Sequence, residues 1–153
     1  MPTPTITTAT VRGPSLDQAR WIPFADNIDA RGRLTAVEGE GHVPFAIQRV
    51  FYMHQVTPGQ ERGGHAHPET DQVAVAVHGS LKIDVSDGSE TRTFELTDPA
   101  RGLFLPRRIW CRLYDFTPDA VCVVFASTHY DYEAVIRSWD GYLGLLAQRS
   151  IAR

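Results

Sequence analysis

The sequence predicts a mainly β protein, folded as a sandwich or a barrel. Short segments rich in Val, Ile, Phe, Tyr and Thr recur at regular spacing, and glycine or proline separates them. Residues 81–85 and 91–96 alternate apolar and polar side chains, and Asp87-Gly88 between them is typical of a tight hairpin turn. A chain of 153 residues is long enough for one domain with its own core.

The expected strands follow this punctuation along the chain. Residues 47–55 form one strand, which ends before the turn signal Pro58-Gly59. The remaining strands are expected at 72–77, 81–85, 91–96, 102–105, 111–116 and 121–126. Only the C-terminal part departs from this pattern, because apolar residues recur at helical spacing between 133 and 147. We expect one or two short helices there, packed on the outside of the β structure.

Composition narrows the class of protein. Residues 1–20 are expected to be a flexible lead-in without a signal-peptide pattern, and 21–153 a single domain. No apolar run approaches the about 18 residues that span a bilayer. Cys111 and Cys122 are too few for a disulfide framework, which indicates reduced thiols and a cytoplasmic protein. The net charge of −3, with no basic stripe, argues against nucleic-acid binding.

The most informative stretch is RGGHAH, residues 62–67. Side chains two apart on a strand point to the same face, so His65 and His67 would converge if that face looks into a barrel. A solvent-exposed pair after a glycine-rich loop is the alternative. The spacing of Gly59, the two histidines, position 72 and Gly79 matches the first cupin motif, which favours convergence.

The metal ligands of that motif are incomplete here. Metal-binding cupins place a glutamate where this chain has Gln72, and a neutral amide brings no charge to a divalent ion. In the second cupin motif, Arg108 replaces a glycine and Cys111 replaces a histidine. We therefore expect no metal and no other cofactor. A zinc site made by His65, His67, Cys111 and water remains the alternative.

The chain resembles the WxcM-like sugar 3,4-ketoisomerases, which act on dTDP-4-keto-6-deoxyglucose. The resemblance runs from about residue 24 to 143 and rests on five segments in the same order: 29–38, 43–52, 62–67, 109–116 and 126–140. It implies an RmlC-like cupin fold, a jelly-roll β-barrel with a short C-terminal helical segment. It also implies an isomerase whose substrate is a dTDP-linked nucleotide sugar.

The implied reaction moves the ketone from C4 to C3 without a redox cofactor. A base removes the C3 proton, an enediol forms, and protonation at C4 gives a dTDP-3-keto-6-deoxyhexose. Histidine suits this work because its pKa lies near working pH. The resemblance assigns the role to His65 and His67, and we take His67 as the carbon base, although the motif leaves their order open. Tyr52 would donate to the developing oxyanion, or else pack in the barrel wall.

The resemblance also implies residues that contact the substrate. A guanidinium clamps phosphate oxygens with paired hydrogen bonds, which makes Arg62 and Arg31 candidates for the diphosphate. A turn-capping surface role is the alternative for Arg31, and filling of the barrel mouth is the alternative for Trp110. The full set expected at the substrate is Arg62, Arg31, Gln72, Trp110, Cys111 and Tyr130.

Three other functions remain open from the sequence. They are a metal-dependent cupin enzyme, a non-catalytic nucleotide-sugar-binding cupin, and a sugar epimerase of the same superfamily. The resemblance further implies a homodimer, in which an N-terminal strand is exchanged between subunits. It also places the reaction in 3-amino-deoxysugar biosynthesis, with an aminotransferase as the next enzyme.

Overall fold

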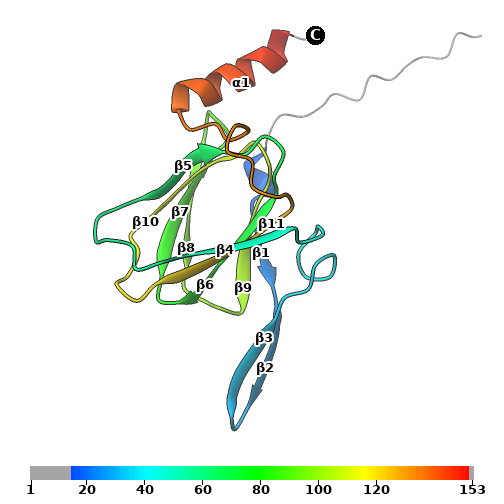
Figure 1. Ribbon diagram of the computed structural model, residues 1–153, viewed down its shortest axis with the longest axis vertical. Coiled ribbons are helices and arrows are strands. Elements are labelled where there is room, and N and C mark those ends of the chain that lie inside the picture. Colours follow the sequence, from blue (N-terminus) through cyan, green and yellow to red (C-terminus); the bar gives the residue numbers. More distant parts are fainter. Residues whose placement is uncertain (1–14, 152–153) are drawn as a thin grey trace, which may run out of the picture.

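The computed structural model describes residues 15–151 and is built almost wholly from strands (Figure 1). A short 3-10 helix, η1 (Leu16–Gln18), precedes the first strand, and α1 (Trp139–Ile151) follows the last. The strands are β1 (Arg20–Pro23), β2 (Ala25–Asp29), β3 (Gly32–Ala36), β4 (Arg49–His54), β5 (Arg62–Ala66), β6 (Gln72–His78), β7 (Leu81–Ser86), β8 (Thr91–Leu96), β9 (Arg101–Leu105), β10 (Trp110–Tyr114) and β11 (Val121–Ala126). Each strand expected from the sequence analysis overlaps one of these, so the mainly β prediction is confirmed.

Two antiparallel sheets enclose the core. One has the order β1-β9-β6-β11-β4 and the other the order β5-β10-β7-β8. Alternate residues of both sheets point inward, as the strict alternation of buried residues along β10 and β11 shows. The inward residues include Ala74, Ala76, Leu81, Ile83, Val85, Leu103, Cys111, Leu113, Cys122 and Val124. The sheet edges β4 and β5 lie at one side of this core, and they carry most of the residues discussed below.

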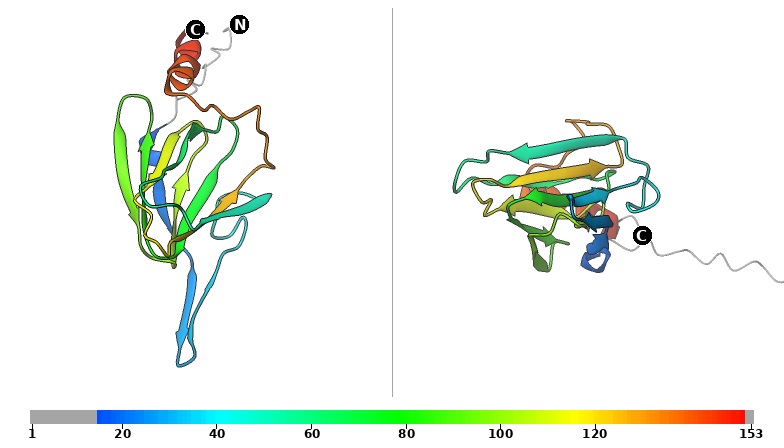
Figure 2. Two further views of the ribbon diagram at one scale, coloured as in Figure 1. Left: turned by 60° about the vertical axis from the view of Figure 1, so that its left-hand side comes forward. Right: turned by 90° about the horizontal axis from the view of Figure 1, so that it is seen from below.

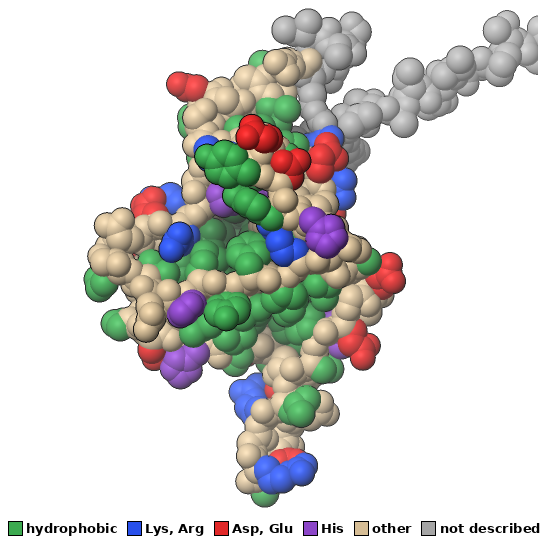
Figure 3. Space-filling view, in the orientation of Figure 1, with side chains coloured by type: hydrophobic (Ala, Val, Ile, Leu, Met, Phe, Trp, Pro, Cys, Tyr) green, Lys and Arg blue, Asp and Glu red, His purple; other side chains and the backbone are tan. Residues whose placement is uncertain are grey.

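The outer face of the five-stranded sheet is partly covered. Val73 and Val75 pack there against Val43 and Phe45, which belong to the segment before β4. Because β6 is buried on both faces, its sequence reads as an almost continuous apolar run rather than an alternating one. Around β4 the cover is missing, and Figure 3 shows hydrophobic side chains gathered there.

Strands β2 and β3 form a separate two-stranded sheet. This hairpin extends away from the barrel, at the end opposite α1 (Figures 1 and 2). Its apolar side chains have little to pack against, since Ile28 is 70% exposed and Leu34 is 64% exposed. A hairpin of this kind gains little stability by itself, which makes it a candidate for contact with another chain.

The expected N-terminal lead-in is too long. Residues 1–14 lie outside the described residues, but 15–20 belong to the folded structure. Ser15 caps η1 by accepting a hydrogen bond from the Asp17 backbone N–H at 3.2 Å, and Leu16 is only 2% exposed within the core. Burial of this leucine ties the segment to the barrel.

The C-terminal helix begins later than its apolar spacing suggests. Ser138 provides the cap, accepting from the Gly141 N–H at 3.0 Å, so α1 starts at Trp139 rather than near residue 133. The residues just before it are extended, because Ile136 exchanges two backbone hydrogen bonds with Ala66 of β5, at 2.9 and 3.0 Å. Between residues 15 and 151, no helix is long and apolar enough to cross a membrane.

Candidate active site

The glycines before the two histidines shape β5. The pairing of β5 with β10 shifts register between Cys111 and Arg112, so β5 bulges at this point. Gly63 has φ 82°, and a Cβ there would lie 2.9 Å from the Cys111 carbonyl oxygen. Only glycine fits this conformation and this close approach, and the bulge sets the direction in which His65 leaves the strand.

The structure brings the two imidazoles together. The ring centroids of His65 and His67 lie 4.6 Å apart, with the rings nearly perpendicular at 81°. Between them Ala66 is fully buried on the opposite face, as alternation requires. Although β5 ends at Ala66, His67 is held in place, because the Arg108 backbone N–H donates to its carbonyl oxygen at 2.7 Å.

Burial makes both imidazoles hard to protonate. Desolvation, together with the charges of His65, Arg49 and Arg137, lowers the pKa of His67 to about 4. Desolvation also lowers the pKa of His65, with a smaller contribution from Arg137. Both rings are therefore neutral at pH 7, the state in which an imidazole can accept a proton.

Gln72, expected at the substrate, contacts His67. Its side chain is only 4% exposed, and its Nε2 atom lies 3.4 Å from the Nε2 atom of His67. An amide N–H can donate to an unprotonated imidazole nitrogen. Because the amide carries no charge, it leaves the low pKa of His67 in place, whereas a carboxylate there would raise it.

Three arginines surround the histidines without a carboxylate partner. Among the described residues, no Asp or Glu oxygen lies within 4.0 Å of a guanidinium nitrogen of Arg49, Arg62 or Arg137, although most of the other described arginines form such pairs. Arg49 and Arg137 act on the pKa of His67, and Arg62 borders the same opening as His65. Unpaired cations beside a pocket favour an anionic ligand.

Each histidine borders a different cavity. His65 lies at an opening of about 630 Å³ between β4 and β5, together with Phe51 and Arg62. His67 lies in a cavity of about 260 Å³, which Arg49 and the segment after β11 enclose; that segment contributes Thr128, His129 and Tyr130. Tyr130, expected at the substrate, thus lies near His67. Sequence reasoning missed Arg49, Arg137 and Thr128.

Tyr52 does not face the histidines. It borders the opening near His65, but its side chain is 63% exposed, and its ring lies 5.4 Å from that of His54 on the outer face of β4. Its neighbours Phe51 and Met53 pack inward against the core. Alternation along β4 therefore overturns the expectation that the Tyr52 hydroxyl points at the reacting atoms.

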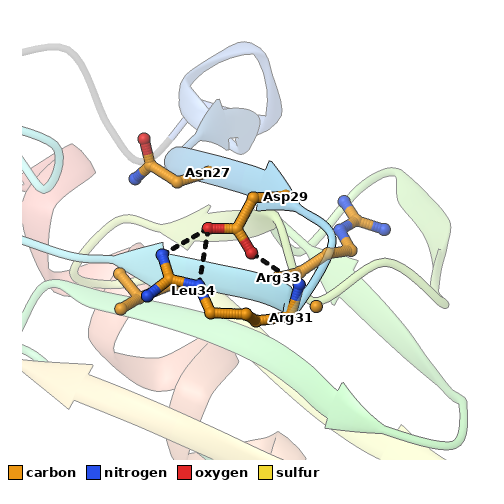
Figure 4. Close-up of a pocket in the computed structure, with 6 residues that line it drawn as sticks. Asn27, Asp29, Arg31, Arg33 and Leu34 are labelled. Carbon is orange, nitrogen blue, oxygen red and sulfur yellow. Dashed lines mark hydrogen bonds and ion pairs between the residues drawn. The ribbon is translucent and has the colours of Figure 1, made fainter.

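Arg31 also lies apart from the histidines. It sits at the tip of the β2–β3 hairpin, where its side chain is 91% exposed and its guanidinium pairs with Asp29 at 2.5 Å (Figure 4). The Arg31 backbone N–H donates to the same carboxylate at 2.8 Å. Within one chain, Arg31 has the turn-capping role and does not contact the pocket.

Trp110 was expected at the substrate but lies outside the barrel. On β10 it shares the outward face with Arg112, and its ring packs 5.4 Å from Trp139 and 5.7 Å from Tyr142. These contacts attach α1 to the four-stranded sheet. The outward direction of Trp110 follows from the burial of its neighbour Cys111.

Cys111 lies in the core beside β5. Its register partner is His65, and its side chain is 4% exposed. Burial raises the pKa of its thiol to about 12, so the group is neutral at pH 7. Within residues 15–151, no three His, Cys, Asp or Glu side chains are grouped so as to hold a metal ion, and the set of His65, His67 and Cys111 is no exception.

Comparison with known proteins places the chain in a family. The sequence model of FdtA, described as WxcM-like, C-terminal, matches residues 17–147. The chain belongs to this family. A curated member, the TDP-4-oxo-6-deoxy-alpha-D-glucose-3,4-oxoisomerase of Aneurinibacillus thermoaerophilus, is 35% identical over 132 residues, which cover 86% of this chain and 95% of that protein.

Solved structures agree with this assignment. The 3,4-ketoisomerase QdtA from Thermoanaerobacterium thermosaccharolyticum, a histidine-to-asparagine variant in complex with TDP-4-keto-6-deoxyglucose, is 35% identical with a TM-score of 0.85. That match covers 90% of this chain and 99% of the QdtA chain. The RmlC epimerase of Mycobacterium tuberculosis, at 16% identity and a TM-score of 0.67, covers 81% of this chain and 70% of that one, and it shows the shared cupin fold.

Proposed function

We propose that this chain is a TDP-sugar 3,4-ketoisomerase that converts TDP-4-keto-6-deoxyglucose into a TDP-3-keto-6-deoxyhexose. The observation that carries the proposal is the pair of neutral imidazoles with ring centroids 4.6 Å apart, beside arginines that have no carboxylate partner within residues 15–151. Related proteins are named for this activity, and one of them binds this keto-sugar. The chemistry is proton transfer, which a histidine pair performs without an oxidant or reductant.

His67 acts as the carbon base. It accepts the proton of C3, the electrons of that C–H bond form a C3=C4 double bond, and the C4 carbonyl becomes an oxyanion. His65, adjacent to it, moves the O3 proton toward O4, so that a ketone forms at C3. The C=C electrons then take a proton at C4. The N–H of protonated His67 exchanges with solvent, so a solvent-derived proton is delivered to C4 and His67 ends the cycle neutral. No net electron is gained or lost.

Two polar side chains support the substrate. Arg62, exposed at the opening beside His65, binds the diphosphate, since a guanidinium matches phosphate oxygens. Gln72 positions His67 through its contact at 3.4 Å. Tyr130 lines the cavity of His67 and closes it on the side of the segment after β11.

The functional unit is a homodimer. The exposed Ile28 and Leu34 of the hairpin and the exposed Val50 and Tyr52 of β4 are apolar surfaces without cover in a single chain. Pairing of the hairpin of one subunit with the β4 surface of another would cover both. In that assembly Arg31 moves with the hairpin toward the partner, which is the remaining route by which it could reach substrate.

The place of the reaction follows from its chemistry. A 3-keto sugar is the substrate form that an aminotransferase needs for a 3-amino sugar, so such an enzyme would consume the product.

We also propose a cytoplasmic location, consistent with two buried thiols and no disulfide. The single domain proposed for residues 21–153 also includes residues 15–20, which belong to the folded structure.

The test is a turnover assay with TDP-4-keto-6-deoxyglucose, with the product identified by proton NMR. Chelator-treated protein is expected to give the 3-keto sugar at an unchanged rate. A requirement for added zinc or iron would support a metal-dependent enzyme instead. Binding of TDP without turnover, and without an effect of His67→Asn, would indicate a non-catalytic binding protein.

A further inference from the structure

The inward face of β4 lacks a hydroxyl at the point where an oxyanion must be stabilised. Since Tyr52 points outward, the inward positions of this strand are held by Arg49, Phe51 and Met53. Phe51 and Met53 have no N–H or O–H to donate. A C4 oxyanion that forms beside His67 therefore has to find its donor elsewhere, and Arg49 is the charged residue on this face.

Arg49, at the wall of this cavity, has a buried donor without an acceptor. Its Nε atom is buried and has no hydrogen-bond partner, the one such side-chain nitrogen or oxygen within the described part of the chain. A buried donor without an acceptor costs about 1–3 kcal/mol, so a fold retains it where a ligand supplies the acceptor. The same side chain lines the 260 Å³ cavity together with His67.

Aromatic rings hold the guanidinium in place. Its central carbon lies 5.1 Å from the ring centre of Phe51 and 5.1 Å from that of Tyr130. Tyr130 belongs to the segment that follows β11 and leads to α1 (Figure 1). A cation fixed between two rings keeps its charge without an acidic partner, and it needs little reorganisation when charge develops nearby.

We propose that Arg49 is a catalytic residue, whose guanidinium donates to the C4 oxyanion of the enediolate formed when His67 removes the C3 proton. This proposal rests on the proposed ketoisomerase function and adds a residue to it. Arg49 takes the role that the sequence analysis gave to Tyr52. Its charge also acts on His67, and this helps to keep that imidazole neutral before the reaction.

An alternative role is distinguishable. If Arg49 bound the diphosphate instead, its loss would weaken the affinity for TDP and raise KM while kcat stayed the same. An oxyanion donor acts only after the C3 proton has left, so its loss lowers kcat and leaves TDP binding intact. The two roles are therefore told apart by which quantity falls in the variant: TDP affinity for a diphosphate ligand, and kcat for an oxyanion donor.

The experiment compares Arg49→Met and Arg49→Lys with wild type and with Arg101→Met. Arg101 is a matched control, because its guanidinium also lies over an aromatic ring, that of Trp21, at 4.0 Å and outside this site. We expect kcat of Arg49→Met to fall about 10²- to 10³-fold. Arg49→Lys should recover part of the loss, TDP affinity measured by calorimetry should change less than about threefold, and Arg101→Met should match wild type.

A second measurement keeps the proposal testable without turnover. NMR titration should show a higher pKa for His67 in Arg49→Met, because a neighbouring positive charge has gone. If wild type converts the sugar but Arg49→Met retains its kcat, or loses TDP affinity instead, the catalytic role of Arg49 is wrong. If wild type itself shows no turnover, the proposed function fails. If the pKa of His67 is the same in Arg49→Met as in wild type, the charge of Arg49 does not act on His67.

Discussion

The Nε2 atom of Gln72 lies 3.4 Å from the Nε2 atom of His67, where a metal-binding cupin would carry a glutamate. The amide leaves the imidazole uncharged, and the pKa of His67 stays at about 4. An ionised carboxylate at this distance would stabilise the protonated ring instead. An amide at position 72, rather than a carboxylate, thus fits a base that must be unprotonated before the reaction.

Gln72→Glu should therefore shift the pH dependence of catalysis. We expect the pKa of His67 to rise by about 1–3 units, so that the acid limb of the kcat/KM profile moves to higher pH. Activity near pH 6 should fall more than activity near pH 8. The control is Gln72→Leu, which removes the contact without adding charge. An acid limb that stays in place in Gln72→Glu would show that position 72 does not set this pKa.

The low pKa of His67 also predicts how stability depends on pH. The unfolded chain has an ordinary histidine pKa of 6.5, and the folded value is about 4. Between these values the unfolded state binds more protons, so stability falls as pH decreases from 6.5 toward 4, by about 3 kcal/mol at most. In His67→Gln this contribution is absent, and urea unfolding at pH 7 and pH 5 should show a smaller drop than in wild type. Equal drops in both proteins would contradict the assigned pKa.

Tyr142→Phe should destabilise the attachment of α1. The Tyr142 hydroxyl is fully buried and donates to the Arg108 carbonyl oxygen at 2.7 Å, with the Ser86 carbonyl oxygen 3.2 Å away. Removal of this donor is expected to cost about 1–2 kcal/mol in the free energy of unfolding. Tyr132→Phe serves as the control, because Tyr132 is 60% exposed. The comparison is made by denaturant unfolding, and equal stabilities of the two variants would argue against the buried hydrogen bond.

The proposed dimer depends on the hairpin. Leu34→Asp places a charge on a side chain that is 64% exposed in one chain, and burial of that charge at an interface would be costly. We expect sedimentation velocity to show a dimer for wild type and mainly monomer for Leu34→Asp. Glu95→Lys changes an exposed position of β8 in the four-stranded sheet, away from the hairpin, and this variant should stay dimeric. A monomeric wild type would rule out the dimer.

Local patterns predicted much of the barrel. Alternation placed the strand at 81–85 and the convergence of His65 and His67, because each depends on neighbours in the sequence. The helix start required the cap at Ser138 and the pairing of Ile136 with Ala66, and the latter is a contact between distant segments. The spacing of apolar residues alone predicts neither the cap nor this pairing.

The candidate site was harder to predict where it depends on direction. Alternation shows that Phe51 and Tyr52 face opposite ways, but only the packing of Phe51 into the core shows which one points inward. The same holds for Cys111 and Trp110. Arg49 shares the parity of Phe51, so a charged residue at an inward position was the signal that could have found it.

The most direct test of the account is deuterium incorporation during turnover in deuterated buffer, for wild type, His67→Asn and His78→Asn. His78 is the control, an exposed histidine that pairs with Asp119 at 3.1 Å away from the site. We predict that wild type and His78→Asn form the 3-keto sugar with solvent deuterium in the ring, and that His67→Asn does neither. Product formation in His67→Asn at the wild-type rate, with or without deuterium in the ring, would contradict proton transfer by the histidine pair.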